Sequence, residues 1–182
     1  MNDEAVLAAM REWIEKAVIG LNLCPFAKAV YVKNQVRFVV SRAPHLDGLL
    51  EDLDRELDFL AAADPEAVDT TLLIHPALLP DFLDFNDFMQ LAEAAVDEHG
   101  LGGVIQIASF HPRFQFEGTA PDDIGNFTNR APFPTLHLLR EASIERAVAA
   151  FPEAETIYQR NIETLEKLGQ AGWDALWEKP RG

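Results

Sequence analysis

The sequence predicts a single α/β domain, with a small, mainly parallel sheet of three or more strands and helices packed on it. Three observations support this class. Short apolar runs of strand length alternate with longer segments of helical periodicity. Each helical segment is long enough to return the chain to the starting edge of the sheet, which favours parallel pairing with right-handed crossovers. A length of 182 residues, 48% hydrophobic and 25% charged, fits one globular domain.

Residues 1–30 are predicted to form an N-terminal helix followed by a Cys-Pro-Phe corner. Apolar residues recur at helical spacing from Val6 to Val18, Asn2 can cap the first turn, and Gly20 can end the helix. The corner then leads into the first strand.

Residues 31–109 are predicted to form the alternating core of the domain. The first strand alternates apolar and polar residues, which is typical of a strand near a sheet edge, whereas the second is apolar throughout and should be covered on both faces. We expect strands over 36–41, 70–75 and 102–110, and helices over 45–63 and 80–100.

Residues 110–135 are predicted to be a functional loop, and residues 136–182 to hold two C-terminal helices. The loop is long for a compact domain, but its phenylalanines can anchor it and its prolines lower the entropy lost on ordering. The two helices are expected over 135–151 and 152–169.

The charge and cysteine content narrow the classes of partner. The formal net charge of −15 excludes a general binder of nucleic acid or of anionic membranes, because both need clustered Lys and Arg. A single cysteine excludes an intramolecular disulfide, and the acidic N-terminus lacks the pattern of a signal peptide. We therefore expect an acidic cytoplasmic protein, without a nucleic-acid or membrane partner.

Two predicted strands end in the same dipeptide, His75-Pro76 and His111-Pro112. Proline ends strand pairing because it has no N–H, and it holds the preceding residue extended. The carboxyl ends of parallel strands form the crevice where ligands bind in such sheets. His75 and His111 are thus candidate catalytic residues that face each other if their strands are neighbours. The alternative is that each histidine only caps its strand and binds a backbone carbonyl.

The long loop carries candidate ligand-binding residues. Arg113, Asn129 and Arg130 can hold a carboxylate or phosphate, which predicts a small anionic partner. The alternative is that the arginines pair with acids of the loop. His137 is expected in the first turn of the next helix, where the dipole favours a neutral imidazole.

Cys24 is the third candidate catalytic residue. It precedes Pro25 at the predicted start of a helical turn, and a thiol at a helix N-terminus has a lowered pKa. The alternative is that Cys24 packs in a helix-to-helix corner as a small hydrophobe.

Several motifs together resemble a bacterial family of uncharacterised proteins, the domain of unknown function 1415. These motifs are "GLNLCPFAKAV", "TTLLIHP", "DFLDFNDF", "ASFHPRFQFEG" with "APDD", and "NRAPFPTLHLLRE", and they span nearly the whole chain. The resemblance implies no activity, substrate or cofactor. It implies that residues of the motif blocks act as one site: Cys24, His75, Asn86, His111, Asn129, Arg130 and His137.

The sequence predicts an enzyme that acts on a small carboxylate or phosphate at a pocket on the C-terminal ends of the strands. Cys24 would be the nucleophile, with His111 or His75 as base. A non-enzymatic domain that binds a small ligand or another protein is the first alternative. The second is a metal enzyme using the histidines with Cys24 or Glu141. The sequence names no cofactor and no oligomeric state.

Overall fold

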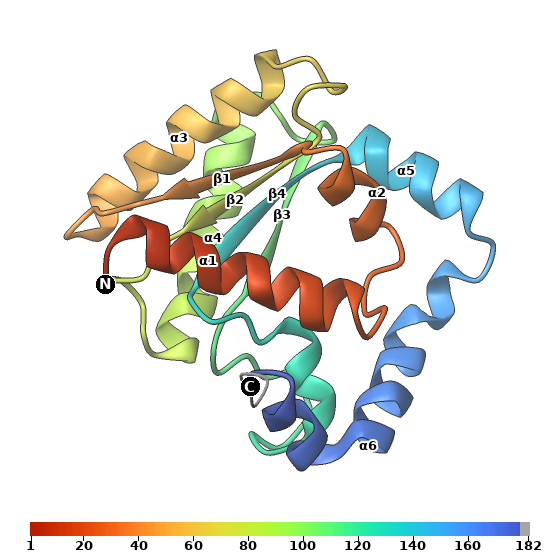
Figure 1. Ribbon diagram of the computed structural model, residues 1–182. Coiled ribbons are helices and arrows are strands. Elements are labelled where there is room, and N and C mark those ends of the chain that lie inside the picture. The colour runs from red at the N-terminus through yellow and green to blue at the C-terminus, as the bar shows by residue number, and fades with distance from the viewer. Residues whose placement is uncertain (179–182) are drawn as a thin grey trace.

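The computed structural model describes residues 1–178, which fold as one sheet with helices on both faces (Figure 1). The sheet has four strands in the order β1-β2-β4-β3. The strands are β1 Val36–Val40, β2 Thr70–Ile74, β3 Ile105–Phe110 and β4 Thr135–Arg140. The α-helices are α1 Asp3–Trp13, α2 Ala27–Val32, α3 Leu46–Ala62, α4 Phe82–Glu98, α5 Glu141–Ala150 and α6 Ile157–Ala175. The π-helix η1 is Ile14–Ile19, and the 3-10 helices are η2 Ile124–Asn129 and η3 Ala154–Thr156.

The α/β class is confirmed, but the sheet is mixed and not mainly parallel. β1 pairs with β2 in parallel, whereas β4 is antiparallel to both β2 and β3. β1, β2 and β3 therefore run in the same direction, as expected, and their carboxyl ends share one edge of the sheet. β1 lies at an edge and β2 is buried throughout, both as predicted.

The strand β4 corrects the sequence analysis, which predicted a helix from residue 135. The segment is rich in leucine, a good helix former, but it fills the slot between β2 and β3 and pairs with both. Leu136 and Leu138 face one side of the sheet, and Thr135 and His137 face the other. Tertiary pairing outweighs the local preference, and the helix α5 begins only at Glu141.

Two apolar cores flank the sheet. One lies under α3 and α4 and includes Leu53, Leu57, Leu73 and Phe85, all fully buried. The other lies under α1, η1 and α6 and includes Trp13. Each fully buried side chain of this size contributes about 1.5–3 kcal/mol to the free energy of folding.

The last helix bends back across the molecule. Gly169 interrupts α6 with φ of +69°, a conformation in which glycine avoids the strain of a Cβ, so the sequence correctly placed a helix end there. The helix packs along η2, and Asn161 donates a hydrogen bond of 2.8 Å to the carbonyl of Leu23. Of the helices in residues 1–178, none has the length and apolar character needed to cross a bilayer. Residues 179–182 of the predicted C-terminal segment lie outside the described part.

Candidate functional site

His75 and His111 lie at the expected edge of the sheet, but they are buried in the core beneath α4. β4 separates their strands, so the condition under which the two histidines would face each other across adjacent strands is not met. The two rings nevertheless share one contact, because each lies against Phe85, with ring centroids 5.7 Å and 5.0 Å from it. His75 is 1% exposed and His111 is fully buried.

Hydrogen bonds assign His111 a structural role. The backbone N–H of Arg113 donates to Nδ1 at 3.0 Å, so the proton is on Nε2, which donates to the carbonyl of Leu79 at 2.9 Å. Burial lowers the pKa of His111, which keeps the ring neutral. This geometry matches the alternative in which the histidine caps its strand and binds a backbone carbonyl.

His75 holds the same loop from the other strand. Its Nδ1 lies 3.3 Å from the carbonyl of Leu78, and its Nε2 is buried with no hydrogen-bond partner in residues 1–178. Burial, assisted by the nearby His111, lowers the pKa of His75 to about 4. The loop that follows β2 is thus fastened to the core by two neutral imidazoles.

The predicted ligand-binding residues of the loop are dispersed. Arg113 and Asn86 are exposed, and Asn129 bonds to the carbonyl of Ser109. Arg130 donates to the carbonyls of Phe114 and Pro121, where the sequence analysis had weighed pairing with acids. Asn129 thus fastens the loop to the end of β3, and Arg130 fastens two parts of the loop to each other.

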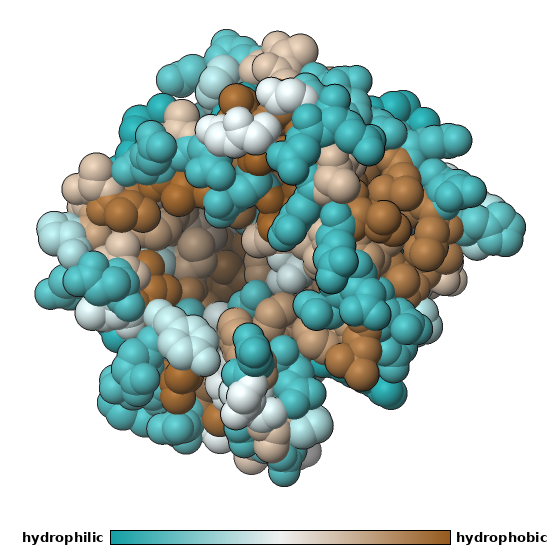
Figure 2. Space-filling view, turned by 180° about the vertical axis from the view of Figure 1, so that it is seen from behind, coloured by the Kyte–Doolittle hydropathy of each residue, from teal (hydrophilic) through white to brown (hydrophobic). Residues whose placement is uncertain are grey.

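A cavity of about 550 Å³ lies on the face of the sheet that α1 covers only in part. We call it the sheet-face cavity. Two of the predicted site residues, Cys24 and His137, line it. The cavity lies near the amino ends of β1 and β2, whereas the crevice was predicted at the carboxyl ends of the strands. Seen from behind, the molecule is hollowed on the side of α5, and apolar residues line the hollow (Figure 2). Among the residues that line the cavity are Ile14, Phe26, Tyr31, Thr70, Leu72, Gln106, Phe110, Leu139, Ile144 and Ala147.

His137 projects into this cavity from the middle of the sheet. The hydroxyl of Thr70 donates to the carbonyl of Leu138 at 2.6 Å and therefore accepts from Nε2–H of His137 at 2.8 Å. The lone pair of Nδ1 is left without a partner among the described residues. Burial lowers the pKa of His137 to about 4, so the imidazole is neutral at pH 7.

Cys24 lies at the edge of the same cavity and is half-buried. The backbone N–H groups of Phe26 and Ala27 lower the pKa of its thiol, but burial has the larger effect and raises it above the usual value. This direction is opposite to the lowered pKa expected for a thiol at a helix N-terminus, and it agrees with the alternative in which Cys24 packs as a small hydrophobe. At neutral pH the thiol is protonated.

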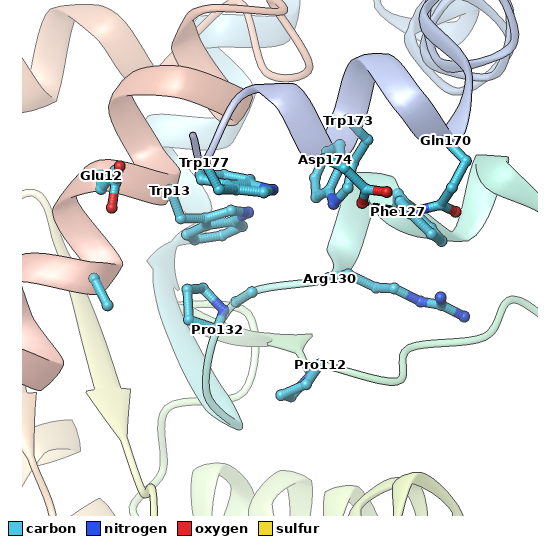
Figure 3. Close-up of a pocket in the computed structure, with 12 residues that line it drawn as sticks. Glu12, Trp13, Pro112, Phe127, Arg130, Pro132, Gln170, Trp173, Asp174 and Trp177 are labelled. Carbon is cyan, nitrogen blue, oxygen red and sulfur yellow. Dashed lines mark hydrogen bonds between the residues drawn. The ribbon is translucent and has the colours of Figure 1, made fainter. Parts of the chain in front are cut away.

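A second pocket, of about 420 Å³, lies at the edge of the sheet where β3 ends and β4 begins. We call it the tryptophan pocket, because Trp13 from α1 and Trp173 and Trp177 from the C-terminal segment line it together with Arg130 (Figure 3). It occupies the place where the sequence predicted a crevice. The sequence analysis did not single out the tryptophans, although three in one chain, two of them four residues apart, are a signal of a shared helix face.

Two polar side chains that follow β1 have structural partners. Ser41 donates to the carboxylate of Asp52, and Arg42 forms an ion pair with Asp3. In the part of the chain that the structure describes, no three His, Cys, Asp or Glu side chains come together as metal ligands. The set of histidines, Cys24 and Glu141 considered for a metal is not assembled.

The comparisons with known proteins agree with the resemblance stated from the motifs. No curated protein and no solved structure matches the chain. The model of one family, described as protein of unknown function (DUF1415), matches residues 5–175. Since this match covers nearly all of the 182 residues, the chain belongs to the DUF1415 family.

Proposed function

We propose that the protein binds a small, mostly apolar molecule in the sheet-face cavity, with a polar group of the ligand at His137. One observation carries this proposal. A neutral imidazole stands on a central strand, is fixed by Thr70 through one nitrogen, and offers the other nitrogen to an open cavity. The ring of His137 is only half-buried, so its Nδ1 can be reached from the cavity, and this free acceptor favours a ligand that donates to it.

The chemistry of the walls defines the class of ligand. His137 and Cys24 are both neutral at pH 7, and an unpaired charge would be costly to bury beside them. The buried part of the ligand should therefore be neutral and carry a hydroxyl or amide donor. Among the charged residues that line the cavity, Lys33, Glu66 and Arg146 are exposed at the rim, and Asp69 is half-buried and accepts from the hydroxyl of Ser143 at 2.6 Å. Lys33 and Arg146 can meet the carboxylate or phosphate that the sequence predicted.

A thermal-shift screen of apolar metabolites that carry a hydroxyl or amide tests the proposal. A ligand at about a hundred times its Kd adds roughly 2.7 kcal/mol to the free energy of unfolding. We expect hits for the native chain to be lost in His137→Leu and in Ala147→Phe, which fills the cavity from α5. His99→Gln, outside the cavity, is the control and should keep them. Hits that survive both cavity variants, or a screen without hits, would overturn the proposal.

A second candidate function is thiol catalysis in the same cavity. Its support is that Cys24 and His137 line one cavity, so the sulfur of Cys24 can add to a carbonyl carbon of the ligand while the C=O π bond breaks and the thiol proton passes by way of Nδ1 of His137 to the carbonyl oxygen. The sequence analysis assigned the base to His75 or His111, but neither lines this cavity.

Alkylation of Cys24 by iodoacetamide discriminates the two functions. Because burial raises the pKa of the thiol, we expect the native protein at pH 7 to react more slowly than free cysteine. Cys24→Ser should abolish the labelling. A reaction faster than that of free cysteine, and slowed in His137→Leu, would favour thiol catalysis over simple binding.

A further inference from the structure

The tryptophan pocket is an independent candidate site, because it lies outside the cavity of the proposed function and shares only Trp13 with it. All three tryptophans of the chain line it. The rings of Trp173 and Trp177 meet edge to face with centroids 5.4 Å apart, and Phe127 lies edge-on to Trp173 at 5.1 Å. The pocket is open to solvent and bounded by aromatic faces (Figure 3).

One donor of this pocket has no acceptor. Trp13 is 2% exposed, and its Nε1–H is buried without a hydrogen-bond partner in residues 1–178. A buried indole N–H normally finds a partner. In this position it favours a ligand that carries an oxygen acceptor.

The charges of the pocket favour a cation. Glu12 and Asp174 line it; Glu12 pairs with Lys16 at 2.7 Å, and Asp174 accepts a hydrogen bond from the neutral amide of Gln170 at 2.9 Å, which leaves its charge uncompensated among the described residues. The one cationic lining residue, Arg130, is already engaged. Its Nε donates to the carbonyl of Phe114, and its guanidinium lies 4.5 Å from the ring centroid of Phe127. Figure 3 shows this guanidinium pointing away from Trp13 and Trp177. Trp177 is the most exposed of the three tryptophans and can meet a second cation.

We propose that the tryptophan pocket binds a small quaternary ammonium compound that carries an oxygen. The ammonium group lies against the faces of Trp173 and Trp177 beside the carboxylate of Asp174, since aromatic rings attract cations through their negative faces. The oxygen of the ligand accepts from Nε1–H of Trp13. An anion would meet two carboxylates in this pocket, and a neutral apolar molecule would leave the indole N–H unpartnered.

Intrinsic fluorescence gives a direct assay, because every tryptophan of the chain is in the pocket. We expect choline to change the emission of the intact protein in a saturable manner at constant ionic strength. The neutral tert-butyl analogue of choline, in which carbon replaces nitrogen, has the same shape and should bind roughly two- to thirtyfold more weakly. Equal affinity for the two, or no saturable change with choline, would overturn the proposal.

Two variants separate the parts of the site. Trp13→Phe keeps an aromatic ring but removes the N–H, so it should weaken choline and leave tetramethylammonium, which has no oxygen, unchanged. Asp174→Asn should weaken both cations and not the neutral analogue. His99→Gln is the matched control and should change none of the affinities. If Trp13→Phe fails to fold, Asp174→Asn decides: unchanged affinity for choline would overturn the proposal.

Discussion

Two adjacent threonines of β2 bury their hydroxyl groups, but only one of the two hydroxyls is hydrogen-bonded within residues 1–178. Thr70 and Thr71 are adjacent in β2 and both are buried, but their side chains lie on opposite faces of the sheet. The hydroxyl of Thr70 has two partners, whereas that of Thr71 has none in the part of the chain described. The unmet hydroxyl costs free energy that an isosteric apolar side chain would not.

We therefore expect Thr71→Val to raise the free energy of unfolding by about 1 kcal/mol. Thr70→Val is the matched control and should lower it by about 1–3 kcal/mol, because it leaves the carbonyl of Leu138 and the Nε2–H of His137 without their partner. Urea denaturation measures both. A destabilised Thr71→Val would mean that its hydroxyl is bonded in solution.

At the scale of residues, the sequence located His75 and His111 at the ends of strands but could not give their hydrogen bonds. The His-Pro dipeptides mark His75 and His111 because proline ends a strand wherever it falls. Their hydrogen bonds depend on where the carbonyls of Leu78 and Leu79 come to lie, and only the folded loop determines that. Cys24 and His137 share a cavity for the same kind of reason, since residues 113 positions apart meet only through the sheet.

At the scale of elements, Gly169 sets the direction of the last helix. Its φ of +69° turns the chain, so that Trp173 returns to pack against Phe127. A Cβ at this position would meet nothing within 4 Å, so the cost of a side chain is conformational and not steric against neighbours.

We expect Gly169→Ala to lower the free energy of unfolding by about 1–3 kcal/mol, because φ of +69° with ψ of 172° is a backbone conformation almost confined to glycine. Glu166→Ala, at an exposed position of the same helix, should change it by less than about 0.5 kcal/mol. Thermal unfolding followed by circular dichroism compares the two. If Gly169→Ala behaved like Glu166→Ala, the helix would have to run straight through this position.

A histidine at the end of α4 links that helix to α3. His99 lies between two carboxylates, 2.9 Å from Asp54 and 2.7 Å from Asp58, and its hydrogen bond to Asp58 contributes most to raising its pKa above 6.5. A raised pKa in the folded state stabilises the fold fully below the unfolded value, and this contribution is lost as the pH rises through the folded value.

The stability advantage of the native chain over His99→Gln should accordingly be largest below about pH 6.5 and shrink as the pH rises. The ion pair of His99 with Asp54 is near the surface, so added salt should also reduce this stability advantage. Denaturation midpoints at several pH values and two salt concentrations test this. An advantage that grew with pH would contradict the assigned ion pairs.

The elements themselves were well predicted except for β4. Helices and outer strands follow from periodicity, which the chain carries locally. A strand inserted between two others is specified by the partners it finds, and "TLHLLR" has neither a turn before α5 nor a clear alternation to mark it. The mixed sheet and the sheet-face cavity beside His137 were not predicted for this reason.

For the whole molecule, two buried histidines predict a loss of stability in acid. The folded-state pKa values of His75 and His137 are about 4, below the ordinary value of 6.5, because burial disfavours the charged ring. Between pH 6.5 and 4 the unfolded chain binds more protons than the folded one, so stability falls as the pH is lowered through this window.

The His137→Leu variant should lose less stability than the native chain over this window, by about 2 kcal/mol. Urea denaturation at pH 7 and at pH 4.5 gives the comparison, and His99→Gln serves as the control because its titration has the opposite sign. Parallel pH profiles for the native chain and His137→Leu would show that this ring is not held neutral.

The tryptophan pocket is built from both ends of the described chain, which determines when it can form during synthesis. One wall of the pocket comes from residues 12–13 and another from residues 170–177. The pocket therefore cannot form until almost all of the described chain has been synthesised. The four strands and the helices α3 and α4 have all been synthesised by residue 140. A nascent chain can therefore hold a folded sheet while one wall of the tryptophan pocket is still absent.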